Sequence, residues 1–161
     1  MSGFLTVFHV VFCLVGIASG AMVLFGLCNG KVLDQCTVLF LRVSLIASIA
    51  GLLSQMHDML PAQKVSMLSV YVSGVAILAW RKFELTGIWS SIFAFTATIV
   101  LCLDVMMILI QAFKWFAPVN ASGSPQSNPA LLATQLLITV LFAALGLWAA
   151  WKFNEASSHR S

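Results

Sequence analysis

The sequence predicts an all-α fold, namely a polytopic integral membrane protein built as a bundle of five transmembrane helices. Three observations predict it: an apolar composition, five long apolar segments, and an uneven distribution of basic residues among the connections. Of 161 residues, 61% are hydrophobic and only 8% are charged, and the mean hydropathy is +1.03. A soluble core of this size cannot bury that much apolar surface, so the lipid bilayer is the expected surrounding of the chain.

The five apolar segments follow one another along the chain. A helix that spans the hydrocarbon core needs about 20 predominantly apolar residues. Four segments meet that length, and the third, with about 16 residues, is flanked by Lys64 and Arg81, whose long stems can reach the interface. We therefore expect five spans within a single transmembrane domain over residues 1–161. The expected spans are about 4–28, 36–56, 65–80, 88–113 and 130–151.

Helix-breaking residues mark the connections between these segments. Asn29 and Gly30 end the first segment, Pro61 stands where the third can begin, and Gly87 separates the third from the fourth. The stretch 117–129 carries three of the four prolines and is the one long connection that the sequence predicts.

Basic residues predict the orientation, because lysine and arginine gather in cytoplasmic connections. Five spans place the two termini on opposite sides. The side that holds the C-terminus carries six basic residues and the other side two, which predicts an N-out, C-in topology. The six are Lys31, Arg42, Arg81, Lys82, Lys152 and Arg160, and the two are Lys64 and Lys114. Because these charges are scattered, no nucleic-acid surface is expected.

Several short runs of residues, spread over most of the chain, are shared with one group of proteins. They are Leu24-Phe25-Gly26-Leu27 with Gly30-Lys31, Thr37 to Leu41, Leu60-Pro61, Ala79-Trp80-Arg81-Lys82-Phe83, Thr134-Gln135 and Leu145-Gly146. In these runs the chain resembles a family of small bacterial five-helix integral membrane proteins of unknown function. The resemblance implies the five-helix fold and a multi-pass protein of the cell inner (plasma) membrane, and it implies no activity.

Polar side chains within the apolar segments form the candidate site, and they concentrate in the outer half of the predicted bundle. By helical rise, Asp104 lies about 13 Å inside the fourth segment. Asp104 and Gln111 are seven residues apart and share a helix face, and Ser66, Ser69 and Ser73 follow one stripe of the third segment. The candidate residues of this intramembrane polar site are His9, Tyr71, Asp104, Gln111 and Gln135.

Asp104 is the most informative of these residues, and two interpretations of it stay open. A carboxylate in hydrocarbon costs several kcal/mol unless it is paired, hydrated or protonated. In one interpretation Asp104 is a proton or cation site, paired with His9. In the other it is a neutral carboxyl that is hydrogen-bonded to a neighbouring helix and joins the two helices.

The remaining histidine and cysteine residues give little indication of cofactor chemistry. His57 and Asp58 are expected at the outer interface. His9 and His57 are the one pair that could ligate a haem, which needs ligands at matched depth, and by helical rise they differ by about 8 Å. The cysteines lack metal-site spacing, so we expect no bound metal and no cofactor, with haem as the alternative.

Three functions follow from these observations. No nucleophile triad or phosphate-binding loop is present in the sequence, so we predict no catalytic residues and no enzyme activity. The first hypothesis is a non-enzymatic accessory membrane subunit that binds a membrane-protein partner or a second copy of itself. The alternative is a small proton- or cation-coupled transporter that uses the polar cluster around Asp104. The second alternative is a haem or quinone redox protein.

Overall fold

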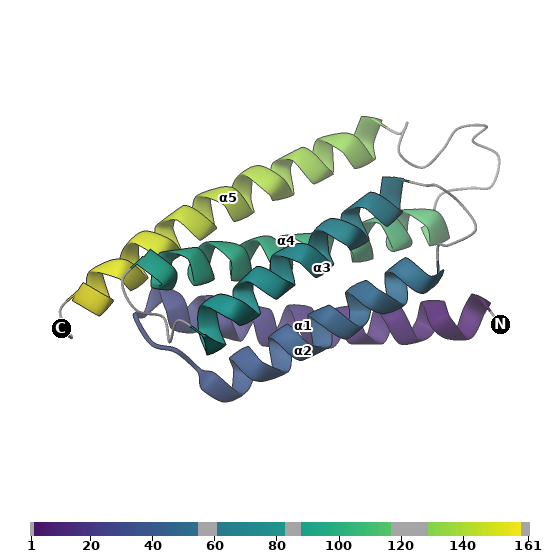
Figure 1. Cartoon of the computed structure of the whole chain (residues 1–161). Coiled ribbons are helices and arrows are strands. Elements are labelled where there is room, and N and C mark those ends of the chain that lie inside the picture. Colours follow the sequence, from purple (N-terminus) through teal and green to yellow (C-terminus); the bar gives the residue numbers. More distant parts are fainter. Residues whose placement is uncertain (1, 55–60, 83–87, 117–128, 159–161) are drawn as a thin grey trace.

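The computed structural model describes residues 2–54, 61–82, 88–116 and 129–158, and these residues form five α-helices (Figure 1). The prediction of an all-helical chain with five helices is confirmed. By length and composition, α1, α2, α4 and α5 are apolar enough to cross a membrane, whereas the apolar part of α3 is a shorter stretch, Ser66–Arg81. The helices are α1 (Ser2–Cys28), α2 (Asp34–Ser54), α3 (Pro61–Arg81), α4 (Ile88–Phe116) and α5 (Pro129–Ser158).

The observed helices differ from the predicted spans mainly at their polar ends. The third helix has 21 residues and begins at Pro61, four residues before the predicted span. The fifth helix continues to Ser158, seven residues past the predicted end. Helical backbone hydrogen bonds can continue through polar residues that favour a helix. Lys152 and Glu155 are such residues, and both lie in the helical extension. A helix therefore extends beyond its apolar stretch.

The end of α1 shows how the sequence sets a helix boundary. Gly30 has a positive φ of 66°, which an L residue with a side chain rarely adopts. The Gly30 N–H donates to the carbonyl of Leu27, and the Lys31 N–H donates to the carbonyl of Gly26. These two bonds are those of a Schellman motif, which satisfies carbonyls that the helix end leaves free. The predicted stop at Asn29 and Gly30 is confirmed.

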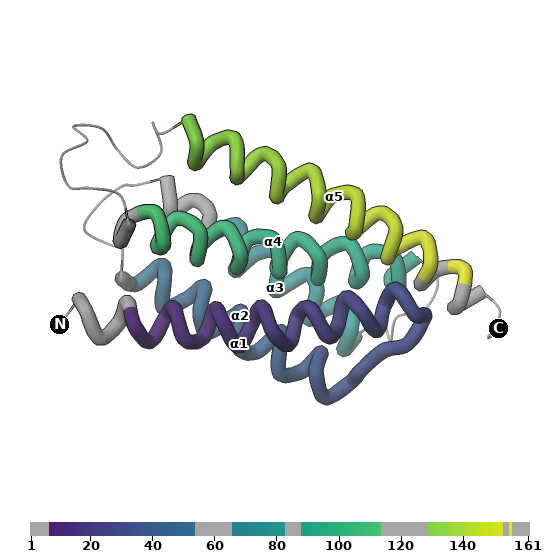
Figure 2. Tube along the Cα trace, turned by 180° about the vertical axis from the view of Figure 1, so that it is seen from behind, coloured from purple at the N-terminus to yellow at the C-terminus, as the bar shows by residue number. Residues whose placement is uncertain are grey.

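The helices alternate in direction, so α1 begins and α5 ends at opposite ends of the bundle (Figures 1 and 2). Helices α1, α2, α3 and α4 form a ring in which each packs on the next and α4 closes on α1. Helix α5 lies outside this ring, where it packs along α4 and touches α1. In this arrangement α2 and α4 face each other across the centre of the ring.

The interior of the ring is mainly apolar in one half. The buried hydrophobic cluster draws on the second halves of α1 and α3, the first halves of α2 and α4, and Ala149 of α5, so it lies towards the end where α1 turns into α2. Phe40 and Phe93 are fully buried there, and alanines of α3 and α4 let the helices approach. Thr37 and Ser90 are also buried at this end, whereas His9, Ser48 and Ser69 lie buried towards the other end.

Small residues make the close helix contacts possible. Three pairs of small residues spaced four apart, Gly16/Gly20, Ala47/Gly51 and Gly146/Ala150, lie at contacts within this chain. A Cβ atom added at Gly20 would stand 2.7 Å from Cε2 of Phe40 and 2.8 Å from Cδ1 of Leu101. By contrast, a Cβ added at Gly74 of α3 would meet no atom within 4 Å.

We expect Gly20→Ala to destabilise the protein by about 1–3 kcal/mol, because the buried Phe40 ring has no room to move. The matched control is Gly74→Ala. That change enters open space and should leave stability unchanged or raise it by up to about 1 kcal/mol, since alanine favours a helix over glycine. Unfolding of the two variants in detergent micelles measures the difference. Equal stability of both variants would contradict the packing described here.

Candidate functional site

The centre of the bundle holds a hydrogen bond between two helices that are not neighbours in the ring. The Ser44 hydroxyl of α2 donates to Oδ2 of Asp104 on α4 over 2.5 Å. Asp104 is only 3% exposed and Ser44 is fully buried, so both groups lie away from the surface. The bond of His9 to Ala47 and the bond between Ser48 and Ser69 join adjacent helices, whereas the Ser44–Asp104 bond crosses the ring.

A glycine of the third adjacent helix makes room for this bond. An added Cβ at Gly16 of α1 would stand 3.1 Å from Oδ2 of Asp104 and 3.2 Å from the Ser44 hydroxyl oxygen. The backbone of α1 therefore lies directly against the pair. Three helices thus enclose the carboxyl group. A larger side chain in place of Gly16 would crowd the carboxyl oxygen.

His9 lies nearer to the start of α1 and is also buried. Its Nδ1 is 2.9 Å from the carbonyl oxygen of Ala47 on α2. A carbonyl oxygen only accepts, so Nδ1 carries the hydrogen in this arrangement and Nε2 is the accepting nitrogen. The thiol of Cys13, one turn along α1, lies 3.6 Å from Nε2 and donates to it. Gly51 of α2 leaves room for the ring, because an added Cβ would be 3.0 Å from Cε1 of His9.

Serine side chains join α2 to α3 between these two sites. The Ser48 hydroxyl donates to the Ser44 carbonyl over 2.7 Å. A hydroxyl has one hydrogen, so the Ser69 hydroxyl is the donor in its 2.8 Å bond to the Ser48 hydroxyl oxygen. Ser66, one turn before Ser69, is buried on the same face of α3 and lies against Gly51. The polar interior thus continues from His9 to Asp104.

The expected pairing of His9 with Asp104 is not formed. His9 bonds Ala47 and Cys13, whereas Asp104 bonds Ser44. The physical reason is depth: His9 is seven residues from Gly16, which by helical rise is about 10 Å along α1. Cys13 lies between the two and is within electrostatic range of Asp104.

Two buried hydroxyls make no hydrogen bond within the described residues, namely Ser73 Oγ and Thr37 Oγ1. Ser73 lies one turn after Ser69 on α3, and Ser44 lies one turn before Ser48 on the antiparallel α2. This register brings Ser73 to the level of the Ser44–Asp104 bond. A buried hydroxyl without a partner carries a desolvation cost of about 1–3 kcal/mol.

The other predicted site residues do not join this cluster. Tyr71 is 73% exposed on the outside of α3, opposite the buried serines. Gln111 and Gln135 are half-buried, and neither forms a hydrogen bond with His9 or Asp104 among the described residues. His57 and Asp58 lie outside the described residues, so the structure says nothing of their predicted interfacial position.

The polar interior offers little to a cofactor. Among the described residues there is no group of three or more histidine, cysteine and acidic residues that could hold a metal ion. Both ring nitrogens of His9 are engaged, so a haem iron at His9 would have to break the contact with Ala47 or with Cys13.

The most important residues that sequence reasoning missed are Ser44 and Ser48. They belong to a stripe of α2 with the three-and-four spacing that places residues on one helix face, the same signal that drew attention to the serines of α3. The stripe is Thr37, Leu41, Ser44, Ser48 and Gly51. Each of these residues is buried, so the spacing alone could have identified the inward face of α2.

Comparison of the chain with protein-family models, curated proteins and solved structures finds no match in any of the three. The resemblance to bacterial five-helix membrane proteins therefore stays a prediction. The function has to be argued from the geometry of the chain itself.

We expect Asp104→Asn to fold almost as well as the original chain, because the amide keeps an oxygen that accepts the Ser44 hydrogen bond. Asp104→Leu removes this acceptor and leaves the Ser44 hydroxyl buried without its partner. It should destabilise the protein by on the order of 1–2 kcal/mol. Thermal unfolding in detergent compares the two variants. If Asp104→Asn is as unstable as Asp104→Leu, the carboxyl has a role other than accepting this bond.

Proposed function

We propose that this chain is a multi-pass membrane protein with five spans, its N-terminus outside and its C-terminus in the cytoplasm. Four apolar helices of sufficient length support insertion, and in α3 the charged residues Lys64 and Arg81 lie near the two ends. Following the resemblance, the proposed location is the cell inner membrane of a bacterium.

The distribution of side chains over the bundle supports this orientation. Lys31, Arg81, Lys82 and Lys152 are exposed and lie at the end where α1 and α3 finish. Trp80, Trp89 and Trp151 lie at the same end, as expected for a membrane interface. The tryptophans favour a membrane interface at this end, and the basic residues favour this end as the cytoplasmic one.

The topology is tested with reporters fused after the C-terminus. A fluorescent protein should fluoresce there, and alkaline phosphatase should stay inactive, because it requires export. The matched control carries the same reporters before the N-terminus, where the phosphatase should be active. An active C-terminal phosphatase together with a dark fluorescent fusion would reverse the proposed orientation.

For the activity, we propose a non-enzymatic accessory subunit that binds another membrane-embedded helix. The observation that carries this proposal is the low burial of α5. Only 11% of its apolar stretch is buried, against 39%, 50% and 56% for the other three long apolar helices. At the same time, polar side chains of the interior already have hydrogen-bond partners within the bundle, as the His9–Ala47, Ser44–Asp104 and Ser48–Ser69 bonds show. The surface of the bundle, more than its interior, is therefore available for recognition.

One face of α5 is suited to such a contact. In a bilayer, helices associate through close packing, which small residues permit. The α5 outer face combines two alanines with larger apolar side chains at helical spacing, and all of its members are exposed. It consists of Ala133, Leu137, Val140, Ala144, Leu147 and Trp151. The partner is a helix of another membrane protein or α5 of a second copy.

Photocrosslinking tests this face directly. A photoreactive phenylalanine at Val140 should give one discrete crosslinked species in membranes, because Val140 lies in the middle of the α5 outer face. The control places the same residue at Tyr71, which is exposed in the middle of α3 and should crosslink to no protein. Crosslinked mass separates a second copy from another protein. Absence of a product at Val140, or equal products at both positions, would contradict the proposal.

A proton- or cation-coupled transporter is the second candidate. The observation that favours it is the unpartnered Ser73 hydroxyl at the level of Asp104, with Cys13 between Asp104 and His9. These groups could form a polar path towards the start of α1.

In this second function, Asp104→Asn would keep the fold and abolish proton or cation flux in reconstituted vesicles, because an amide cannot exchange a proton. The carboxyl carbonyl stretch of Asp104 would also respond to pH and to D₂O within seconds. In the accessory function, that infrared band should be insensitive to both. The infrared measurement on the original chain and on Asp104→Asn therefore distinguishes the two candidates.

A further inference from the structure

A groove runs along the outside of the bundle between α1, α4 and α5. Its volume is about 480 Å³, and no charged side chain lines it. Apolar side chains of all three helices form its walls, and Asn29, at the end of α1, lies at one end of it. The groove is lined by Ala21, Leu24 and Asn29 from α1 and its end, by Val105 from α4, and by Leu145 and Trp148 from α5.

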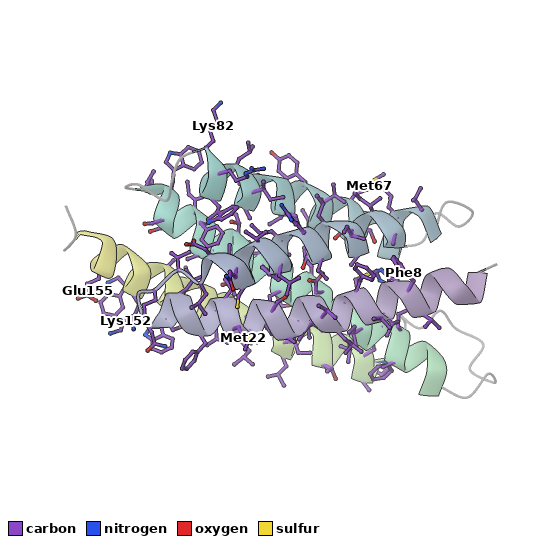
Figure 3. All side chains as sticks on the ribbon, turned by 90° about the horizontal axis from the view of Figure 1, so that it is seen from below. Phe8, Met22, Met67, Lys82, Lys152 and Glu155 are labelled. Carbon is purple, nitrogen blue, oxygen red and sulfur yellow. The ribbon has the colours of Figure 1, made fainter. Side chains whose placement is uncertain are left out.

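Exposed basic side chains lie beside the Asn29 end of this groove. Lys31 follows Asn29 by two residues, and its N–H bonds the Gly26 carbonyl, which keeps its backbone beside the last turn of α1. Lys152 lies one helical turn beyond Trp148, a wall residue, and Figure 3 shows Lys152 next to that end of α1. The groove is thus apolar along its length and has two cationic groups at one mouth.

Acidic residues also lie at this end, but farther from the mouth. Asp34 begins α2, and Glu155 follows Lys152 by three residues in the direction away from the groove. At this end of the bundle, Lys31 and Lys152 are therefore the charged residues that stand closest in sequence to the walls of the groove.

The size of the groove bears on what can fill it. One turn of an α-helix with its side chains is 5.4 Å tall and 10–12 Å across, and so occupies about 420–610 Å³. A spanning helix of about 20 residues has five to six such turns, so it is much bulkier than the space in the groove. A flexible acyl chain is thinner and can follow a narrow apolar path, while its headgroup stays at the interface.

We propose that this groove binds an anionic glycerophospholipid, with one acyl chain along α1, α4 and α5 and its phosphate at Lys31 and Lys152. Basic residues between helices at the cytoplasmic face are suited to anionic headgroups. The inference rests on the proposed membrane insertion, and on the proposed placement of this end at the cytoplasmic face. The bound lipid fills the space between α5 and the ring and supports the position of α5.

Native mass spectrometry of the full chain, released from detergent with added phosphatidylglycerol or phosphatidylcholine, tests the proposal. We expect retention of one phosphatidylglycerol and weaker retention of phosphatidylcholine. Lys31→Gln and Lys152→Gln should each lower the affinity for phosphatidylglycerol about fivefold, because a lysine near an anionic surface contributes about 1 kcal/mol. Lys82→Gln is the charge-matched control. Lys82 is exposed at the same end of the bundle but on the opposite side from Lys152, and its loss should change nothing (Figure 3).

Filling the groove tests the acyl chain separately. Ala21→Phe places a ring inside the groove and should reduce retention of both lipids. Leu78→Phe, an exposed position of α3 away from the groove, is the matched control and should retain lipid as the original chain does. Equal retention of the two lipids or unchanged retention by Ala21→Phe would each overturn the proposal.

Carbonate extraction of membranes separates this inference from the proposed membrane insertion. A chain that carbonate releases is not an integral membrane protein, and both proposals would fail. A chain that stays in the membrane pellet but retains no phosphatidylglycerol would overturn the lipid site alone.

Discussion

The hydrogen bond between Ser44 and Asp104 is the interaction on which the arrangement of the ring depends. A carboxyl group at the middle of an apolar bundle is costly unless a partner reaches it. Asp104 finds this partner on α2, across the centre of the ring, and not on a neighbouring helix. The bond therefore fixes the rotation of both helices about their axes, because a turn of either would expose one of its polar groups to the apolar interior.

The small residues of the interior follow from this constraint. Helices can face each other across a ring at hydrogen-bond distance only if the remaining helices carry little volume at that level. Gly16 provides the space beside Asp104, and Gly51 provides it beside His9. Helix α5 lies outside the ring, along α4 and α1. Its exposed outer face and the groove beside it are consequences of that position.

The sequence predicted the five helices well, because apolar length is a local property. It predicted contacts between helices less well. The face of Tyr71 could have been derived, since Tyr71 lies two residues from both Ser69 and Ser73 and so projects from the far side of α3. The partner of Asp104 could not, because the candidates were serines on several helices and only the packing order decides which of them reaches the carboxyl. One of the two interpretations of Asp104 paired it with His9, but His9 bonds the backbone carbonyl of Ala47.

The most direct test of this account is a double-mutant cycle on the bond itself. Ser44→Ala removes the donor, Asp104→Leu removes the acceptor, and the double variant removes both. The free energies of unfolding in detergent should show a coupling of about 0.6–1.7 kcal/mol, the range found for hydrogen bonds between membrane helices. Ser69→Ala with Asp104→Leu is the control cycle, since Ser69 bonds Ser48 and makes no bond to Asp104. Additive effects of Ser44→Ala and Asp104→Leu, within the error of the control, would contradict the central role of this bond.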